Sequence, residues 1–408
     1  AQPITTAFDW SSWGGFSNAT EMCNNNGACR KRDAAVMCPS YRATGAEKDS
    51  TRGRANTLRL ALSGQLGPDA LTSPDMAESM ALCVGCKACR RECPTGVDMA
   101  RMKTEYLAQQ LTTSGLALRD RLIAYLPRYA PIAARLARLI NGATQLPAAQ
   151  LLQEKLTGFS RHRALPRWHT GTPLPRSLSL PAGDGPEVVV LFDTFTRYFE
   201  PENGHALISV LRKLGCRVQI AGDINARPLC CGRTFLSAGL IDEARTEARR
   251  LISALTPHLE RGTPIIGLEP SCLLTLRDEY PALLTASLTK KLSEQSLLLE
   301  EFLARSHKQL RFDFETTASC RVAIHGHCHQ KAFDSLDVTV KLLKSIEDVE
   351  VDVISSSCCG MAGSFGYQSE NYEVSMKMAE LSLLPRIRNE NENVIITASG
   401  TSCRQQII

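Results

Sequence analysis

The sequence predicts an α+β protein with a helical, cysteine-rich N-terminal domain, a helical connector and two related α/β lobes. Its cysteines form two groups, seven before residue 113 and nine after residue 185, with none between. In the C-terminal part, buried strands, helices and a Cys-Cys-Gly triplet recur in one order, which is typical of duplicated parallel β/α units. The predicted domains are 1–112, 113–185, 186–310 and 311–408.

Composition excludes several classes of protein. The 408 residues, 43% of them apolar, can bury two or three cores, and a net charge of +5 is too small for a nucleic-acid binder. Sixteen clustered cysteines in a chain of this length favour metal or redox chemistry in a reducing, cytoplasmic compartment. We expect no membrane-spanning helix and no secretory signal. The chain starts without Met, so both a processed protein and part of a longer polypeptide fit.

The densest motif is the run Cys83-x2-Cys86-x2-Cys89-x3-Cys93-Pro. Cysteines two residues apart in a tight turn offer three thiolates to three corners of one [4Fe–4S] cube, and the cysteine before proline turns to another cluster. Zinc is the alternative, but it prefers paired C-x2-C knuckles. The run therefore predicts an iron–sulfur site.

The cysteines upstream of this run are candidates for the remaining cluster ligands. In a two-cluster ferredoxin arrangement, Cys38 would complete the first cluster, and Cys23, Cys29 and Cys93 would bind a second. Asn26 stands where a further cysteine is expected, so seven thiolates are available for the eight ligand positions of two clusters. The second cluster then has three irons, uses a non-cysteine ligand such as Asn26, or takes a ligand from elsewhere. A single cluster with Cys23 unligated is the remaining alternative.

The segment at 49–63 predicts a helix, because Asp49 or Ser50 can cap it and leucines supply its apolar residues. Its three arginines either form a solvated face or lie beside an anionic cluster. They are Arg52, Arg54 and Arg59.

The connector is basic, with nine Lys or Arg and one acid, Glu154, between residues 121 and 176. Four apolar residues share one face of a predicted helix: Ile132, Leu136, Leu139 and Ile140. We expect this face to pack against the protein. Docking on an acidic partner or on an anionic membrane surface is the alternative. Proline and glycine at 170–186 predict a linker.

Each predicted lobe contains three strands separated by helices. The strand at 188–192 has a buried pattern, and the first helix of the first lobe ends at Gly215. No glycine-rich dinucleotide loop or Walker motif occurs. The predicted strands are 188–192, 217–223 and 264–269 in the first lobe and 322–327, 349–356 and 393–399 in the second.

Histidines and cysteines of the second lobe gather at strand ends, where open α/β sheets bind ligands. Adjacent cysteines rarely form a disulfide, so we expect the pair at 358 and 359 to face a metal or cluster. Three histidines, at 325, 327 and 329, flank Cys328, so mixed ligation is open, with one histidine only orienting its neighbours. Buried reduced cysteines are the alternative. The candidate ligands are Cys328, Cys358, Cys359, Cys403, His327 and His329.

The first lobe has fewer such residues. Cys230, Cys231 and Cys272 remain, but Thr194 stands where Cys328 stands in the second lobe. These thiolates could hold a cluster with one open corner, a zinc ion, or nothing. Cys216 and Cys320, beside strand starts, are expected to be buried structural residues.

These motifs together resemble a known family. CNNNGACR, MCPSYRAT and CVGCKACRRECPTGVDMARMK are similar to the iron–sulfur half of FAD-linked D-2-hydroxyacid dehydrogenases, which carry a flavin domain upstream. The later triplets resemble the CCG domains of the glycolate oxidase iron–sulfur subunit, the anaerobic glycerol-3-phosphate dehydrogenase small subunit and the heterodisulfide reductase catalytic subunit. The resemblance implies a two-cluster, ferredoxin-type N-terminal domain followed by two CCG lobes.

The resemblance also implies a function. FAD on another domain or subunit would oxidise a D-2-hydroxyglutarate- or D-lactate-like acid, and this chain would pass the electrons singly to an acceptor such as a quinone. An oligomer is implied, in the cytoplasm or peripheral on the cytoplasmic membrane face. No catalytic residue is assigned. The implied cluster ligands are Cys83, Cys86, Cys89, Cys93 and Cys38, with Cys29 and Cys23 for the second cluster.

One departure separates the chain from heterodisulfide reductase, whose repeats end in C-x2-C. Glu269 and Gly400 occupy the first position of that pair here, leaving Cys272 and Cys403 single. This departure counts against a heterodisulfide-reductase-like catalytic subunit. A membrane-docking iron–sulfur subunit of a glycolate or glycerol-3-phosphate dehydrogenase complex is the other alternative.

Overall fold

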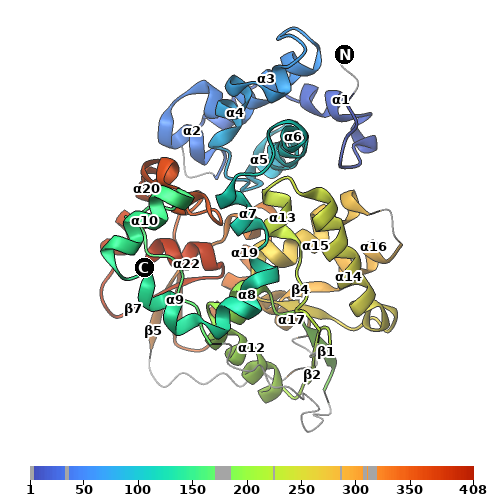
Figure 1. Cartoon of the computed structure of the whole chain (residues 1–408). Helices are drawn as coiled ribbons and strands as arrows, with labels where there is room; N and C mark the ends of the chain where they lie inside the picture. The colour runs from blue at the N-terminus through green and yellow to red at the C-terminus, as the bar shows by residue number, and fades with distance from the viewer. Residues whose placement is uncertain are drawn as a thin grey trace.

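The structure is a computed structural model that describes residues 4–32, 36–170, 185–223, 226–284, 287–306, 310 and 319–408. The linker predicted at 170–186 lies almost entirely outside these residues, as does the predicted start of the second lobe at residue 311. The expected mixture is confirmed: a helical N-terminal part and connector are followed by two small parallel sheets with their own helices (Figure 1).

The N-terminal domain is helical throughout its described residues. The predicted helix at 49–63 is present as α3 (Thr51–Leu62), and Ser50 is its cap, accepting the Gly53 N–H at 2.9 Å. Asp98 caps α6 (Met99–Ser114) in the same way. The other helices are α1 (Phe16–Glu21), α2 (Pro39–Thr44), α4 (Pro74–Ala81) and α5 (Ala88–Glu92).

The connector breaks into four short helices, and its apolar residues do not pack as predicted. The buried face consists of small residues such as Ala130, Ala134 and Ala137. Ile132 and Leu139 are 62% and 72% exposed. The prediction that this apolar face packs against the protein is therefore wrong. The helices are α7 (Leu118–Ala124), α8 (Leu126–Arg135), α9 (Ala137–Ala143) and α10 (Pro147–Thr157).

The first lobe is a parallel sheet with the order β2-β1-β3-β4 and helices on both faces. Val188 and Val190 pack toward α12 and α17, while Val189 packs toward α14, α15 and α16, as the period of two requires. The strands are β1 (Glu187–Val190), β2 (Arg217–Ile220), β3 (Ile265–Gly267) and β4 (Ser296–Leu298). The helices are α11 (Thr194–Tyr198), α12 (Pro201–Lys213), α13 (Arg233–Ser237), α14 (Ile241–Glu260), α15 (Pro270–Leu283), α16 (Ser287–Gln295) and α17 (Leu299–Ser306).

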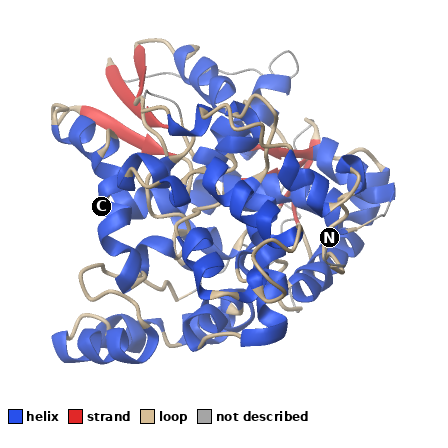
Figure 2. Cartoon of the chain, turned by 90° about the horizontal axis from the view of Figure 1, so that it is seen from above, coloured by secondary structure: helices blue, strands red, loops and turns tan. Residues whose placement is uncertain are grey.

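The second lobe repeats this arrangement with three parallel strands in the order β6-β5-β7. Seen from above, the strands of the two lobes form two separate groups, one of which lies at the edge of the molecule (Figure 2). The strands are β5 (Cys320–His325), β6 (Val349–Val353) and β7 (Val394–Ala398). The helices are α18 (Cys328–Ala332), α19 (Leu336–Lys344), α20 (Tyr372–Glu380), α21 (Leu383–Arg388) and α22 (Thr401–Ile407).

The N-terminal domain sits on the lobes through α5. This helix packs against α18 of the second lobe, and α18 in turn packs against α15 of the first. The cysteine-rich loop before α5 therefore lies at the junction of three parts of the molecule. Among the described residues, no helix is long and apolar enough to cross a bilayer.

Candidate metal centres

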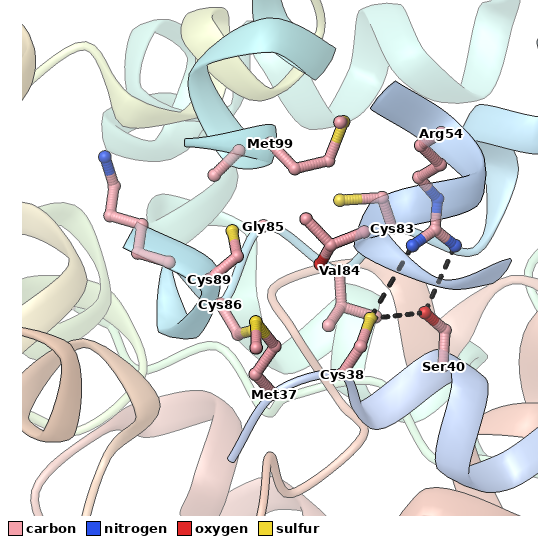
Figure 3. A pocket seen from close by; sticks show the side chains of 13 residues that line it. Met37, Cys38, Ser40, Arg54, Cys83, Val84, Gly85, Cys86, Cys89 and Met99 are labelled. Atoms are coloured by element: carbon pink, nitrogen blue, oxygen red, sulfur yellow. Dashed lines mark hydrogen bonds between the residues drawn. The ribbon is translucent and has the colours of Figure 1, made fainter. Parts of the chain in front are cut away.

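Four cysteines of the N-terminal domain line one enclosed cavity. Cys83, Cys86 and Cys89 come from the loop before α5 and from α5 itself, and Cys38 comes from the residue before α2. Figure 3 shows their sulfur atoms around a common space. Gly85, with φ of 60°, allows the tight turn between the first two of them. The structure thus brings together the four residues that the spacing assigned to the first cluster.

A buried arginine places a positive charge beside this cavity. Arg54, from α3, donates through Nη1 to Cys38 Sγ at 3.7 Å and through Nη2 to Ser40 Oγ at 3.1 Å. Burial alone would lower the pKa of its guanidinium, but the thiolates of Cys83 and Cys38 raise it. The sequence left open whether the arginines of α3 form a solvated face or lie beside an anionic site. Arg54 lies beside the cysteine cavity.

The donor set fits an iron–sulfur cluster. All sixteen cysteines are free, so these four thiols are not used in disulfides. Burial raises the pKa of the Cys86 and Cys89 thiols well above the usual range, and neighbouring thiolates add to this effect. Thiols that are buried, free and directed at one cavity become favourable thiolates only when cations compensate them, as the irons of a cluster do.

The residues expected to bind a second cluster are less completely gathered. The thiolates of Cys23 and Cys29 interact electrostatically with each other, and the Arg52 N–H donates to Cys29 Sγ at 3.4 Å. Cys93 makes a local contact, with its Sγ 3.3 Å from Thr95 Oγ1. The Asn26 side chain accepts the Ala28 N–H at 2.8 Å in its own turn. Assignment of these residues to a second cluster stays a prediction.

The second lobe holds the tightest group of ligand atoms among the described residues. One ligand atom each from His325, Cys359 and Cys403 lies within 4.8 Å of the other two, and all three residues are buried. They follow the carboxyl ends of β5, β6 and β7, the edge at which open parallel sheets bind ligands.

His325 belongs to the sequence motif but was not among the candidate ligands, and its tautomer suits a metal. The Ser356 hydroxyl donates to the Ile354 carbonyl at 3.2 Å, so it accepts from His325 Nδ1 at 2.7 Å. This leaves Nε2, which is buried, as the nitrogen that faces the cysteines. Burial lowers the pKa of the ring, although an interaction with Cys359 opposes this effect. A buried imidazole nitrogen beside two thiols fits a metal ligand.

Two further cysteines surround this group. Cys328 and Cys358 are hydrogen-bonded to each other, and this bond lowers the pKa of Cys328 to about 6. Cys359 has its pKa lowered by hydrogen bonds from Cys358 and Cys403. Lys331 donates to the Ser356 carbonyl at 2.5 Å and so holds the loop that carries the pair. Four thiols and one imidazole thus form one polar cluster.

The two other histidines of the motif point elsewhere. His327 accepts the His329 N–H on Nδ1 at 3.1 Å, and its Nε2 lies 4.0 Å from a carboxylate oxygen of Glu269 in the first lobe. A Cβ at Gly400 would lie 2.3 Å from the His327 ring, so only glycine permits this approach. Glu269 also accepts the Thr401 N–H at 2.8 Å. The two positions that lack a cysteine therefore form the interface between the lobes.

In the first lobe, Cys230, Cys231 and Cys272 form a hydrogen-bonded row rather than a tight cluster. Each thiol bonds to the next. The bond with Cys231 raises the pKa of the Cys230 thiol but lowers that of the Cys272 thiol, whose pKa burial nevertheless raises to about 12. Burial, helped by Glu269, also raises the pKa of nearby Asp193 to about 6. The alternatives for this lobe stay open.

The segments that carry the N-terminal and second-lobe sites contact each other. His329 Nε2 lies 3.1 Å from the carbonyl oxygen of Gly85, which stands between Cys83 and Cys86 in the sequence. The thiolates of Cys86 and Cys328 interact electrostatically. Sequence reasoning could not find this contact, because the two residues it joins are 244 positions apart.

An ion cluster fastens the same loop to the first lobe. Asp278 on α15 pairs with Lys87 and Arg90 and lies 3.1 Å from Arg101 Nη2. Lys87 stands between Cys86 and Cys89 in the sequence and also pairs with Glu279 at 2.8 Å. Asp278 and Lys87 are almost fully buried.

Family models match the N-terminal domain and each of the two lobes separately. A 4Fe-4S dicluster domain matches residues 19–97, and a cysteine-rich domain matches twice, at 189–277 and 322–408. The first range contains the seven N-terminal cysteines, and the second and third each contain the Cys-Cys-Gly triplet of one lobe.

Curated relatives match nearly the whole chain. It is 27% identical to D-2-hydroxyglutarate dehydrogenase of Pseudomonas putida, over 97% of this chain and 42% of that protein. The corresponding Escherichia coli protein is 26% identical over 94% of this chain and 41% of its own length. One subunit of the anaerobic glycerol-3-phosphate dehydrogenase of Escherichia coli is 29% identical, over 72% of this chain and 74% of its own length. The chain thus spans about two fifths of the D-2-hydroxyglutarate dehydrogenases it matches.

Proposed function

We propose that this chain, a homologue of the D-2-hydroxyglutarate dehydrogenases with a 4Fe-4S dicluster domain and two cysteine-rich domains, is the electron-transfer part of a flavin-dependent dehydrogenase. A flavin-bearing domain or subunit would oxidise a D-2-hydroxyacid, and this chain would carry the electrons to an acceptor such as a quinone. An iron–sulfur cluster, when bound, accepts and donates electrons one at a time. The domain boundaries given above are part of this proposal.

One observation carries the proposal: the segment that holds the N-terminal cysteines contacts α18, the helix of the second lobe that begins at Cys328. His329 Nε2 on that helix lies 3.1 Å from the Gly85 carbonyl oxygen. A second bond, from Ser357 Oγ to the Val36 carbonyl at 2.7 Å, joins the loops beside them. Two thiol-rich sites whose supporting segments contact each other suit electron transfer through the chain better than independent structural metals.

Anaerobic stopped-flow mixing with photoreduced free flavin tests this function. We expect the visible absorption of the clusters to bleach, because reduced flavin stands in for the absent flavin part. Cys403→Ser should remove metal from the second-lobe site and leave the N-terminal bleaching intact. Cys216→Ala is the control, because this buried cysteine belongs to none of the cysteine clusters described above. It should change neither the metal content of the second-lobe site nor the bleaching. A chain that contains iron and sulfide but shows no bleaching contradicts the proposal.

The exposed connector favours a second role, peripheral docking on an anionic bilayer. Leu139, Leu152 and Leu156 are 72%, 57% and 64% exposed. Arg135 and Arg138 of the same connector are exposed, and the ion pairs of the described connector residues involve other arginines. Exposed leucines flanked by unneutralised cations are typical of a membrane-surface helix.

Vesicle co-sedimentation checks this role. The chain should bind vesicles containing phosphatidylglycerol, and raised salt or Leu139→Glu together with Leu152→Glu should reduce binding at least about tenfold, since charges replace buried apolar area. Leu66→Glu, at an exposed leucine outside the connector, is the control. Salt-independent binding, or binding unchanged by the connector variant, would sink the idea.

A further inference from the structure

Arg54 is a charged side chain that the fold buries completely. It is 0% exposed, although a guanidinium keeps its charge at every ordinary pH. Arg54 belongs to α3, and its side chain lines the cavity of the first four cluster cysteines (Figure 3). Burial of a cation is costly unless nearby anions compensate it. The groups that face Arg54 therefore indicate its role.

The guanidinium of Arg54 is directed at a sulfur atom. Nη1 donates to Cys38 Sγ at 3.7 Å, while Nη2 donates to Ser40 Oγ at 3.1 Å and Nε donates to the Ser79 carbonyl at 2.8 Å. Three bonds to separate groups fix the planar fork in one orientation. Burial lowers the pKa of Arg54, but the thiolates of Cys83 and Cys38 raise it, and they do so more strongly than any carboxylate. The positive charge thus faces the cysteine cavity.

Two lysines near the same cysteines are used differently. Lys87 is paired with two carboxylates of α15, which match its charge. Lys103 Nζ donates at 2.6 Å to the backbone carbonyl of Cys83. Arg54, in contrast, donates from its charged group to the sulfur of a predicted cluster ligand. The charge of Arg54 is therefore the one placed to act on the cluster through a ligand sulfur.

A buried carboxylate limits the charge of Arg54. Asp49 is 1% exposed, and its Oδ1 lies 3.8 Å from Arg54 Nη2 without a hydrogen-bond partner among the described residues. Its Oδ2 accepts the Thr44 hydroxyl at 2.7 Å. Charges interact strongly where water is excluded, so Asp49 and Arg54 act on the cavity with opposite signs. The pair allows the local charge to be changed in either direction.

We propose that Arg54 raises the reduction potential of the first N-terminal cluster through the sulfur of Cys38, and that Asp49 limits this effect. The inference rests on the proposed function and deepens it, because the potential decides how readily this cluster takes an electron from its donor. Reduction of a [4Fe–4S] cluster adds one electron and hence one negative charge, which a fixed cation beside a ligand sulfur stabilises. Arg54 acts through Cys38 and is a positioning residue, not a ligand.

A redox titration of the full chain, followed by electron paramagnetic resonance of the reduced clusters, tests this role. The reduction step that Cys86→Ser removes belongs to the first cluster. In Arg54→Met, the equilibrium constant for that step should fall at least about tenfold, which for one electron is about 59 mV. Arg54→Lys keeps the charge but loses the planar fork, so its potential should lie between those of Arg54→Met and the wild type.

Arg52→Met is the matched control. Arg52 lies on the same helix, but its guanidinium bonds both carboxylate oxygens of Glu47, at 2.7 and 3.0 Å. Glu47 is 46% exposed, so solvent screens this pair. Methionine at position 52 also leaves the backbone N–H that donates to Cys29 Sγ unchanged. The first-cluster potential of this variant should equal that of the wild type.

Asp49→Asn supplies the opposite change. Asparagine keeps the size of the side chain and can still accept from Thr44, but it removes the negative charge beside Arg54. The first-cluster potential should therefore rise. Shifts of opposite sign in Arg54→Met and Asp49→Asn, at constant iron and sulfide content, are not expected from a loss of packing, which would disturb both variants alike.

The outcomes separate this inference from the proposed function. Unchanged first-cluster potentials in Arg54→Met and Asp49→Asn, with iron and sulfide intact, would overturn the role of Arg54 and leave the electron-transfer function standing. If Arg54→Met assembles no cluster, Asp49→Asn decides alone: a raised potential supports the role and an unchanged one overturns it. A wild-type chain without iron and sulfide would instead contradict the proposed function itself.

Discussion

Cys86→Ser is expected to remove about four irons and about four sulfides per chain and to abolish electron transfer through the N-terminal site. Cys86 is buried at the centre of the cysteine loop, where its thiol faces the cavity shared with Cys38 and Cys89. Serine keeps the size of the side chain but offers a hydroxyl that stays protonated in place of a thiolate. Iron and acid-labile sulfide analysis, with the visible spectrum, measures the loss.

The matched control is Cys320→Ser. Cys320 begins β5, and it is half-exposed rather than buried, which corrects the expectation from its place beside a strand. No thiol contact of the candidate sites involves it, so its variant should retain the wild-type iron content. Equal iron and sulfide in the Cys86 variant and the wild type would refute the ligand assignment.

Asp278→Ala is expected to lower the free energy of unfolding by about 3 kcal/mol, because it removes the carboxylate that the buried cations share. Lys87 and Arg101 are both buried, and after the substitution Lys87 keeps only Glu279, at 2.8 Å, and Arg101 keeps only Asp98, at 3.9 Å. Denaturant unfolding followed by circular dichroism measures the change. Asp242→Ala removes a carboxylate whose side chain is 94% exposed and should cost at most about 0.5 kcal/mol. Equal stability of the two variants would show that the ion cluster does not fasten the loop to the first lobe.

The pH dependence of this difference has a definite sign. Burial alone raises the pKa of Asp278, but Lys87, Arg101 and Arg90 outweigh burial and hold the pKa well below its usual range. A lowered folded-state pKa contributes stability above the unfolded value of about 3.9 and loses it as pH falls. The gap between wild type and Asp278→Ala should therefore be constant near neutral pH and shrink below about pH 4.

Local elements were predictable where one residue type decides them. Ser50 caps α3 because its hydroxyl meets a free N–H, and the valines of β1 require a buried strand. The connector was not predictable, since its leucines and its alanines both have helical spacing. Only tertiary packing decides that Ala130 and Ala134 face inward and Leu139 faces solvent.

The candidate sites, too, could be predicted only in part from the sequence. Spacing placed Cys83, Cys86 and Cys89 together, because three cysteines in one turn need no distant partner. Spacing could not distinguish the three histidines of the second lobe, whose directions depend on neighbours far along the chain. His325 faces two cysteines, while His329 reaches Gly85 in another domain. A serine two residues before Cys358 was the one local signal for His325, because it fixes the ring.

Iron, zinc and acid-labile sulfide per chain, measured on anaerobically purified protein, test the central claim most directly. The proposed function predicts about eight irons or slightly fewer from the dicluster domain, with matching sulfide and with additional metal at the second-lobe site. About four irons would reduce the N-terminal domain to one cluster and leave the electron-transfer function in place. Zinc without sulfide would contradict the function, because zinc carries no electrons.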